Sequence, residues 1–223
     1  MRRIALLAFF VLAAVPAGAQ IINVPQGSLA KEPGFFLTTS IGLQSIQSVK
    51  DGRTGTIWDF SQSAEFGASL ERSLGRGIAF GVVATYTKTP LHFVDSSAAS
   101  IGYATCCNAH VEVITAGVQF TSGGGAGFHQ LVMINVGVIA FQNFDVKYDG
   151  SVGSPGAPPT RDIDPRLAVG YGFGYGLSPR SEVFLLQEYG VALHQGDGLQ
   201  GGDRRQYQQQ TTRIGFRLGA GSR

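Results

Sequence analysis

Strict alternation of bulky and small residues between Leu167 and Leu177 constrains the fold of this chain more than any other feature. Large apolar or aromatic side chains occupy every second position, and only alanine or glycine stands between them. A period of two places all the large side chains on one face of a β-strand, whereas a helix would scatter them around its circumference. Each glycine inside a helix would also cost roughly 1 kcal/mol. The segment is therefore predicted to be a strand with one bulky face and one slender face.

Seven further segments show the same period less regularly, between turn-rich stretches. In chain order, the eight predicted strands carry apolar faces at Phe35, Leu37, Ile41 and Leu43; Trp58, Phe60, Ala64, Phe66, Ala68 and Leu70; Ile78, Phe80, Val82, Ala84 and Tyr86; Ile114, Ala116, Val118 and Phe120; Val132, Ile134, Val136, Val138 and Ala140; alternate residues from Leu167 to Leu177; Val183, Leu185, Tyr189, Val191 and Leu193; and Ile214, Phe216, Leu218 and Ala220. With flanking residues most of them reach the roughly 9 to 11 residues that a tilted strand needs to cross a bilayer, whereas strands of soluble proteins have about 5 or 6.

The connections between these segments give an independent test, because outer-membrane barrels alternate short periplasmic turns with longer external loops. A chain that starts in the periplasm should have short second, fourth and sixth connections, and these are residues 75–77, 122–127 and 178–181. The third, fifth and seventh connections, residues 95–109, 149–161 and 196–206, are long, and only the first outer connection, 50–55, is short. The pattern predicts an all-β fold, an eight-stranded antiparallel up-and-down transmembrane β-barrel.

Volume decides which face of each strand meets lipid. The interior of an eight-stranded barrel is just wide enough to be filled by side chains, so the bulky face is predicted to point outward and the Gly, Ser, Thr and charged face inward. Aromatic residues then gather near both strand ends, as membrane interfaces require. The predicted external girdle is Trp58, Phe60, Tyr86 and Phe144, and the predicted periplasmic girdle is Phe35, Phe80, Phe120, Tyr175 and Phe216.

The N-terminus has the features of a secretory signal peptide. Arg2 and Arg3 precede an apolar run from Ile4 to Val15, and Ala17-Gly18-Ala19 supplies the small residues that a signal peptidase reads. The run is shorter than the roughly 20 residues of a spanning helix. We expect a signal peptide over residues 1–19, an N-terminal periplasmic segment over 20–33 and the barrel over 34–223.

Charge excludes a nucleic-acid partner. Removal of the signal peptide takes away two arginines from the 17 Lys and Arg, which leaves fifteen against fifteen Asp and Glu. A formally neutral mature chain offers no basic surface for phosphate backbones. No cofactor is expected either, because the glycine-rich stretch at residues 123–125 lacks the lysine and following helix of a phosphate loop and fits a tight turn.

On these segments and connections, the chain resembles the small outer-membrane β-barrel superfamily, which includes the OmpA-type barrel domain and the OmpX and OmpW types. The resemblance covers nearly all of the mature chain and is one of pattern. It implies location in the cell outer membrane, contact with its lipid, and delivery by the barrel-assembly machinery. The last strand, Arg213 to Ala220, looks like the assembly signal of such proteins, with apolar residues at alternate positions, although the chain continues to Gly221-Ser222-Arg223 instead of ending on an aromatic residue.

Charged residues with inward parity are the first candidates for a functional site. They are Glu65, Glu71, Glu188, Arg213 and Arg217. Closure of the ring places the last strand beside the seventh, so Glu188 is expected to reach Arg213 or Arg217. An ion path is one interpretation, and a structural salt-bridge network that closes the lumen is the favoured one, because buried charges normally survive only when they are paired.

Cys106 and Cys107 are adjacent in the outer connection 95–109, in an oxidising compartment. A vicinal disulfide, a cross-link to another chain and a pair of free thiols all remain open. Cys107 and His110 also have a ligand-like spacing, with His92 at the other end of the connection, but a structural or incidental pair is favoured over a metal site.

Three functions compete. The leading hypothesis is a non-enzymatic barrel that acts through its external loops, in structural support, adhesion or surface interaction with a partner of those loops. A narrow porin-like channel for small or apolar solutes is the second. A surface lipid-modifying enzyme is the third, with His194 as a base, although no serine lies close to it in sequence. A soluble secreted barrel of lipocalin type is the rival at the level of the fold.

Overall fold

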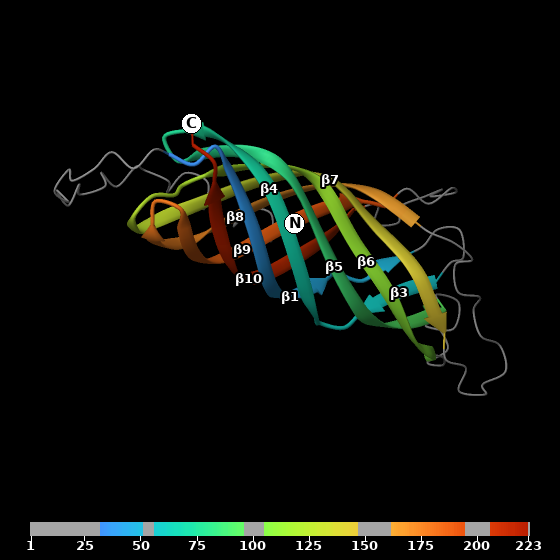
Figure 1. Ribbon diagram of the computed structural model, residues 1–223. Coiled ribbons are helices and arrows are strands. Elements are labelled where there is room, and N and C mark those ends of the chain that lie inside the picture. Colours follow the sequence, from blue (N-terminus) through green and yellow to red (C-terminus); the bar gives the residue numbers. More distant parts are fainter. Residues whose placement is uncertain (1–31, 51–55, 96–104, 147–161, 195–205, 223) are drawn as a thin grey trace, which may run out of the picture. The chain divides into compact units, whose positions relative to one another are not determined.

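The computed structural model describes residues 32–50, 56–95, 105–146, 162–194 and 206–222, which form antiparallel strands (Figure 1). The strands are β1 Phe35–Ile46, β2 Val49–Lys50, β3 Thr56–Phe60, β4 Ser63–Gly75, β5 Ile78–Asp95, β6 Thr105–Ser122, β7 Gly127–Val146, β8 Asp162–Ser178, β9 Ser181–Leu193 and β10 Gln206–Ala220. The predicted signal peptide, and the predicted periplasmic segment as far as residue 31, lie outside the described residues. Within the described ranges no helix is long and apolar enough to cross a membrane.

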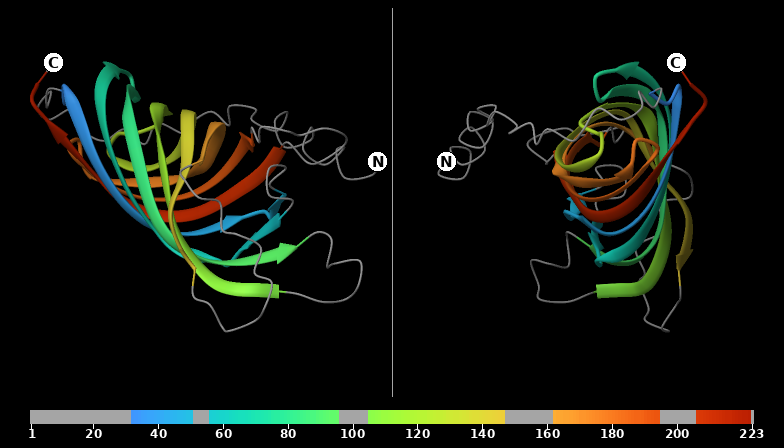
Figure 2. Two further views of the ribbon diagram at one scale, coloured as in Figure 1. Left: turned by 90° about the vertical axis from the view of Figure 1, so that its right-hand side faces the viewer. Right: turned by 60° about the vertical axis from the view of Figure 1, so that its left-hand side comes forward.

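Eight of these strands form a closed ring (Figure 2). Their order is β5-β4-β1-β10-β9-β8-β7-β6, and the pairing of β6 with β5 closes the ring. Closure lets the backbone N–H and C=O groups of every ring strand pair with those of its neighbours. This pairing is necessary in a bilayer, because hydrocarbon offers no hydrogen-bond partners. The predicted eight-stranded antiparallel barrel is confirmed. The two short strands β2 and β3 form a hairpin, and β3 pairs with the external part of β5 beyond the end of β4.

The stagger of paired residues around the ring sets the tilt of the strands. Pairs lead from Ile46 on β1 through Gln209, Gly190, Ala168, Asn135, Gln119, Gly81 and Glu71 back to Phe36 on β1. The path returns ten residues from its start (46 minus 36). Strands of closed barrels tilt by about 35–45° from the barrel axis, and an interior of eight strands has room only for side chains.

The bulky residues of the eight predicted strands point outward, with the exception of Trp58 and Phe60. Most of them keep between 37% and 62% of their surface exposed, for example Leu37 at 51% and Phe66 at 56%. Soluble monomers rarely expose continuous apolar patches of more than a few hundred Å². An apolar wall that runs around the whole ring therefore faces hydrocarbon.

Polar and aromatic residues mark the limits of this wall. On the external side Lys88 and Glu112 stand opposite each other on β5 and β6, just beyond the exposed ring of Tyr86. On the periplasmic side the exposed aromatic rings include Phe35, Phe80, Phe120 and Tyr175, next to the short turns. The predicted outward position of these four rings is confirmed, as is that of Tyr86.

Trp58, Phe60 and Phe144 correct the predicted external girdle. Trp58 is fully buried and Phe60 is 8% exposed, and both pack inside the barrel. The reason is a break at Ser61–Gln62, which separates β3 from β4 and reverses the face on which even-numbered residues lie. Phe144 follows Asn143, whose positive φ of 52° interrupts the alternation of β7, and its ring packs against the same inner cluster.

β5, β6 and β7 continue well beyond the apolar wall on the external side (Figure 2). β5 runs nine residues past Tyr86 to Asp95 (95 minus 86), which is about 30 Å of strand. The outer connection predicted at residues 95–109 is correspondingly shorter, because β6 already begins at Thr105. Alternation persists there, with Ala109, Val111 and Val113 buried inside the barrel.

Candidate functional site

Two arginines and two glutamates from four strands meet in the middle of the lumen. Nη2 of Arg213 on β10 lies 3.1 Å from Oε1 of Glu65 on β4 and 2.9 Å from Oε1 of Glu188 on β9. Arg166 on β8 donates from Nη2 to the same Glu188 oxygen at 2.5 Å. All four side chains are buried. The two positive and two negative charges balance, and we call these four residues the middle ionic layer.

Neutral side chains add hydrogen bonds to the middle ionic layer. Gln44 donates to Oε2 of Glu65 at 2.8 Å, and Thr85 donates to the same oxygen at 3.2 Å. Nε of Arg166 donates to Oε1 of Gln209 at 2.6 Å. Buried ions are tolerated when neighbouring groups replace the water that they have lost. The layer therefore depends on the register of strands that lie on opposite sides of the lumen.

Glycines on the slender faces make room for the large side chains that cross the lumen. A Cβ atom on Gly190 would lie 3.0 Å from Nε of Arg166, and one on Gly215 would lie 2.1 Å from Cζ of Phe184. The neighbouring arginine and phenylalanine therefore occupy the space that a side chain at either glycine would need. The slender face seen in the sequence is thus a condition for filling the barrel with long residues from adjacent strands.

A second ionic group lies toward the periplasmic end. Nη2 of Arg217 on β10 is 3.4 Å from Oε2 of Glu71 on β4, and its Nη1 is 3.9 Å from Oε2 of Glu182 on β9. Nε2 of His129 on β7 lies 3.2 Å from Oε1 of Glu182. The guanidinium carbon of Arg217 also stands 3.9 Å from the centre of the Phe36 ring, within the range of a cation–π contact. We call Arg217, Glu71, Glu182 and His129 the periplasmic ionic layer.

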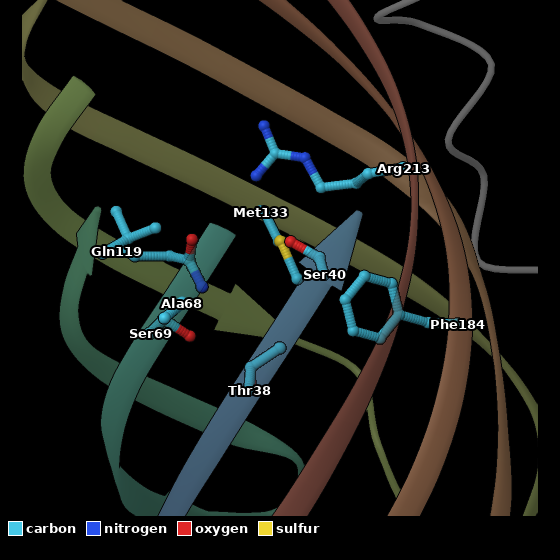
Figure 3. A pocket seen from close by; sticks show the side chains of 9 residues that line it. Thr38, Ser40, Ala68, Ser69, Gln119, Met133, Phe184 and Arg213 are labelled. Atoms are coloured by element: carbon cyan, nitrogen blue, oxygen red, sulfur yellow. The ribbon is translucent and has the colours of Figure 1, made fainter. Parts of the chain in front are cut away.

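An apolar partition separates the two ionic layers over part of the cross-section. It consists of Leu131, Met133, Phe184 and Leu186, which are all buried and in contact. A cavity remains beside it (Figure 3), lined by Thr38, Ser40, Ala68, Ser69, Val83, Gln119, Met133, Phe184 and Arg213. It has room for about one water molecule. A space of this size does not form a conduit.

An apolar plug fills the external part of the lumen. It consists of Ile46, Val49, Trp58, Phe60, Leu91, Ala109, Val111, Val113, Ile139, Phe141, Ala192 and Tyr207. The Trp58 ring lies at its centre, with ring centroids 5.8 Å from Phe141 and 5.3 Å from Phe144 in edge-to-face geometry. Such aromatic pairs add to the stabilisation that comes from burial alone.

One polar group lies within the apolar plug. Nδ1 of His194 is 3.1 Å from Oδ2 of Asp164, and the Tyr207 hydroxyl donates to the same oxygen at 3.1 Å. Both members of the histidine–aspartate pair have fully buried side chains. His194 also contacts the Trp58 ring at 5.5 Å between centroids. The arrangement orients His194 inside the barrel, away from the membrane surface.

The structure divides the five predicted lumen charges between two layers. Glu65, Glu188 and Arg213 lie in the middle ionic layer, while Glu71 and Arg217 lie in the periplasmic ionic layer. Sequence reasoning missed Arg166, Glu182 and Asp164. A signal for the first two was present, since Arg166 and Glu182 each have the inward parity of their strand and lie one residue before the predicted segments that begin at Leu167 and Val183.

The cysteine pair belongs to the extension of β6. The backbone of Cys106 stands opposite Phe93 on β5, while the side chains of Cys106 and Cys107 lie outside the described residues. His92 and His110 are on the paired strands β5 and β6, opposite Asn108 and Pro90 respectively. Among the described side chains, no three His, Cys, Asp or Glu residues come close enough to hold a metal ion.

Comparisons with known proteins agree on the architecture. No protein-family model and no curated protein matches the chain. Among solved structures it is similar to Neisserial surface protein A, with 12% identity and a TM-score of 0.51 over 83% of this chain and 97% of that one. It is also similar to the outer membrane protein OprG from Pseudomonas aeruginosa, with 13% identity, a TM-score of 0.46 and coverage of 84% and 96%. It is also similar to the attachment invasion locus protein Ail of Yersinia pestis, with 12% identity and a TM-score of 0.41 over 84% of this chain and 99% of that one.

Proposed function

Because the chain folds as a small outer-membrane β-barrel, we propose that it is a non-enzymatic protein that acts from its external end and does not pass solutes through its lumen. The filled lumen is the observation that carries this proposal. The periplasmic ionic layer, the apolar partition, the middle ionic layer and the apolar plug follow one another across the described part of the barrel. A hydrated ion would have to displace side chains of both ionic layers and of the apolar plug.

The external end supports the same proposal. β5, β6 and β7 extend beyond the apolar wall and carry the connections 96–104 and 147–161. The apolar plug packs against the inner face of this extension and fixes it to the barrel. Loops on a rigid scaffold are the usual site of recognition. The arrangement suits structural support, adhesion or surface interaction.

The surroundings of His194 argue against surface lipid chemistry. A base that acts on a lipid must reach the membrane interface, within hydrogen-bond distance of the reacting group. His194 instead lies inside the apolar plug, paired with Asp164 and covered by the Trp58 ring. This environment supports a non-enzymatic role in which the pair serves packing.

Conductance tests the closed lumen. The mature protein is inserted into planar lipid bilayers, and the current is compared with that of a general porin prepared in the same detergent. We expect no stable step of conductance, because the charges of both ionic layers are paired and buried. Stable openings in most insertion events would overturn the proposal.

Replacement of the outer connections tests the site of action. Residues 96–104 and 147–161 are replaced by glycine–serine segments of equal length, and heat-modifiable gel mobility confirms that the variant forms the barrel. Producing cells are then compared for attachment to glass, attachment to one another and survival in dilute dodecyl sulfate. We expect the wild-type gain in at least one assay to disappear. A variant that keeps every wild-type effect would show that the connections 96–104 and 147–161 are not the site of action.

A further inference from the structure

In the middle of the lipid-facing wall, polar residues occur on one side of the barrel, whereas exposed Arg72 on β4 and Gln130 on β7 lie close to the periplasmic turns. Gln187 on β9 lies in the middle of an outward row, with Leu185 before it and Tyr189 after it, and it is half-buried. Thr212 on β10 is its partner in register and is exposed. Thr39 on β1, between Leu37 and Ile41, is also exposed. These strands are consecutive in the ring, and Figure 1 shows them side by side.

The opposite side of the barrel has no such polar groups at this depth. Between the periplasmic turns and Lys88, the outward residues of β5 are Ile78, Phe80, Val82, Ala84 and Tyr86. Those of β6 between Phe120 and Ile114, and those of β8 between Leu177 and Leu167, are likewise apolar or aromatic. Gln210, the next outward residue of β10, is exposed and pairs with Tyr189. We call Thr39, Gln187, Gln210 and Thr212 the polar flank.

Hydrogen bonding within the polar flank is incomplete. The Thr212 hydroxyl donates to Oε1 of Gln187, which satisfies the carbonyl half of the amide. No described residue accepts a hydrogen bond from Nε2 of Gln187. An amide N–H that faces hydrocarbon is costly, because lipid chains offer no acceptor. Water reaches the ends of the barrel but not the centre of the wall, where Leu185 and Tyr189 flank the amide.

We propose that the polar flank is the contact surface for a second copy of this chain within the membrane. An amide and a hydroxyl both donate and accept, so each can pair with its own equivalent, whereas a charged group could not. A two-fold axis along the membrane normal keeps equal residues at equal depth and brings Gln187 of one copy opposite Gln187 of the other. The pairing supplies the acceptor that hydrocarbon lacks and leaves the external end of each barrel free.

Energy transfer between labelled copies in lipid vesicles tests the proposal. Cys106 and Cys107 are replaced by serine, and a single cysteine is introduced by Arg180→Cys in the β8–β9 turn or by Ala126→Cys in the β6–β7 turn. The backbone oxygen of Arg180 accepts a hydrogen bond from Gly219 on β10, which places this turn beside the polar flank. The β6–β7 turn lies across the ring. We expect transfer above the random level, and more from position 180 than from position 126.

Removal of the polar groups tests their role directly. In the Arg180→Cys background, Gln187→Leu with Thr212→Val should raise the dissociation constant of the dimer by roughly three- to thirtyfold, the range for polar contacts between membrane segments. Gln130→Leu is the control, since it makes the same chemical change on exposed Gln130 of β7. Gel mobility of the folded barrel is checked for every variant.

Each of the following results would overturn the proposal: transfer no greater than random, equal or greater transfer from position 126, or no change in the dissociation constant after the double substitution. A cross-link from Gln187→Cys to a different membrane protein in cells, without cross-linked dimer, would also overturn it. Val118→Cys on the opposite wall is the matched control for that experiment.

Discussion

Substitution of Arg213 by methionine tests whether the lumen excludes water. Methionine keeps much of the length of the side chain but removes the charge that faces Glu65 at 3.1 Å and Glu188 at 2.9 Å. Glu188 keeps Arg166, while Glu65 retains only the neutral donors Gln44 and Thr85. The middle ionic layer then carries one uncompensated negative charge in a dry interior.

The expected loss follows from that uncompensated charge. Breaking a buried ion pair by removing one partner costs about 3–5 kcal/mol. With an m-value of about 2 kcal/mol per M in urea, the unfolding midpoint falls by roughly 2 M. Adding Glu65→Gln to Arg213→Met restores neutrality, because Arg166 and Glu188 still balance each other. The double variant should therefore be more stable than the sum of the single effects by about 1 kcal/mol or more.

Equilibrium urea unfolding in lipid vesicles, followed by gel mobility and tryptophan fluorescence, measures these differences. Arg72→Met is the control, because Arg72 is an exposed arginine on the outer surface of β4. The free energy of unfolding of Arg72→Met should stay within about 0.5 kcal/mol of the wild-type value. If Arg213→Met shifts the midpoint no more than Arg72→Met does, water solvates the glutamates, and the dry, closed lumen is refuted.

Three further predictions concern the two faces of the wall. Trp58 is the single tryptophan of the chain and is buried in the apolar plug, so brominated lipids should quench its fluorescence weakly. A variant with Phe66→Trp and Trp58→Phe has its tryptophan on the exposed face and should be quenched strongly. Equal quenching of the two proteins would show that Trp58 faces lipid. Gly215→Ala should cost about 1–3 kcal/mol in urea unfolding, because the Phe184 ring occupies the space of the new methyl group, and Phe184→Leu in the same chain should recover part of that loss; additive losses would contradict the steric explanation. Val118→Arg, at an exposed position in the middle of the β6 row, should cost about 2–4 kcal/mol in vesicles, and a neutral result would show that this part of the wall does not face hydrocarbon.

The outer surface was predictable because lipid imposes one requirement on every strand. Leu167 to Leu177 shows it most clearly, since each large residue there is exposed and each small one is buried. Because every outward position in the wall contacts hydrocarbon, large apolar residues recur at every second position of the sequence. The register could not be read in the same way, because the ten-residue stagger depends on pairing between strands.

The interior was less predictable, because parity gives the direction of a side chain but not its neighbours. Glu65 and Arg213 come from strands that are separated in the ring by β1, so their contact depends on the stagger and on the reach of the arginine. Phe184 and Leu186 point inward although they are bulky, since Gly215 and other small residues make space for them. The volume argument holds for the ring as a whole and does not decide single positions.

Trp58 and Phe144 show where alternation fails as a guide. A two-residue break after β3 and a positive φ at Asn143 each reverse the inward face, and neither leaves a clear mark in the sequence. Beyond the apolar wall the outer surface of the strands contacts water, so large apolar residues are no longer favoured on that surface. The same aromatic residues then pack inward as they would in a soluble protein.

The pairing of Phe35 with Ala220 joins the two extremes of the barrel, and this seam governs how the protein can be made. β1 is synthesised before β10, so a nascent chain that lacks β10 holds unpaired strand edges, and such edges recruit other chains. Loss of the last strand would not yield a smaller cylinder; it would yield an unrolled sheet that no bilayer accepts. Closure of the barrel therefore requires β10 to be present and paired with β1.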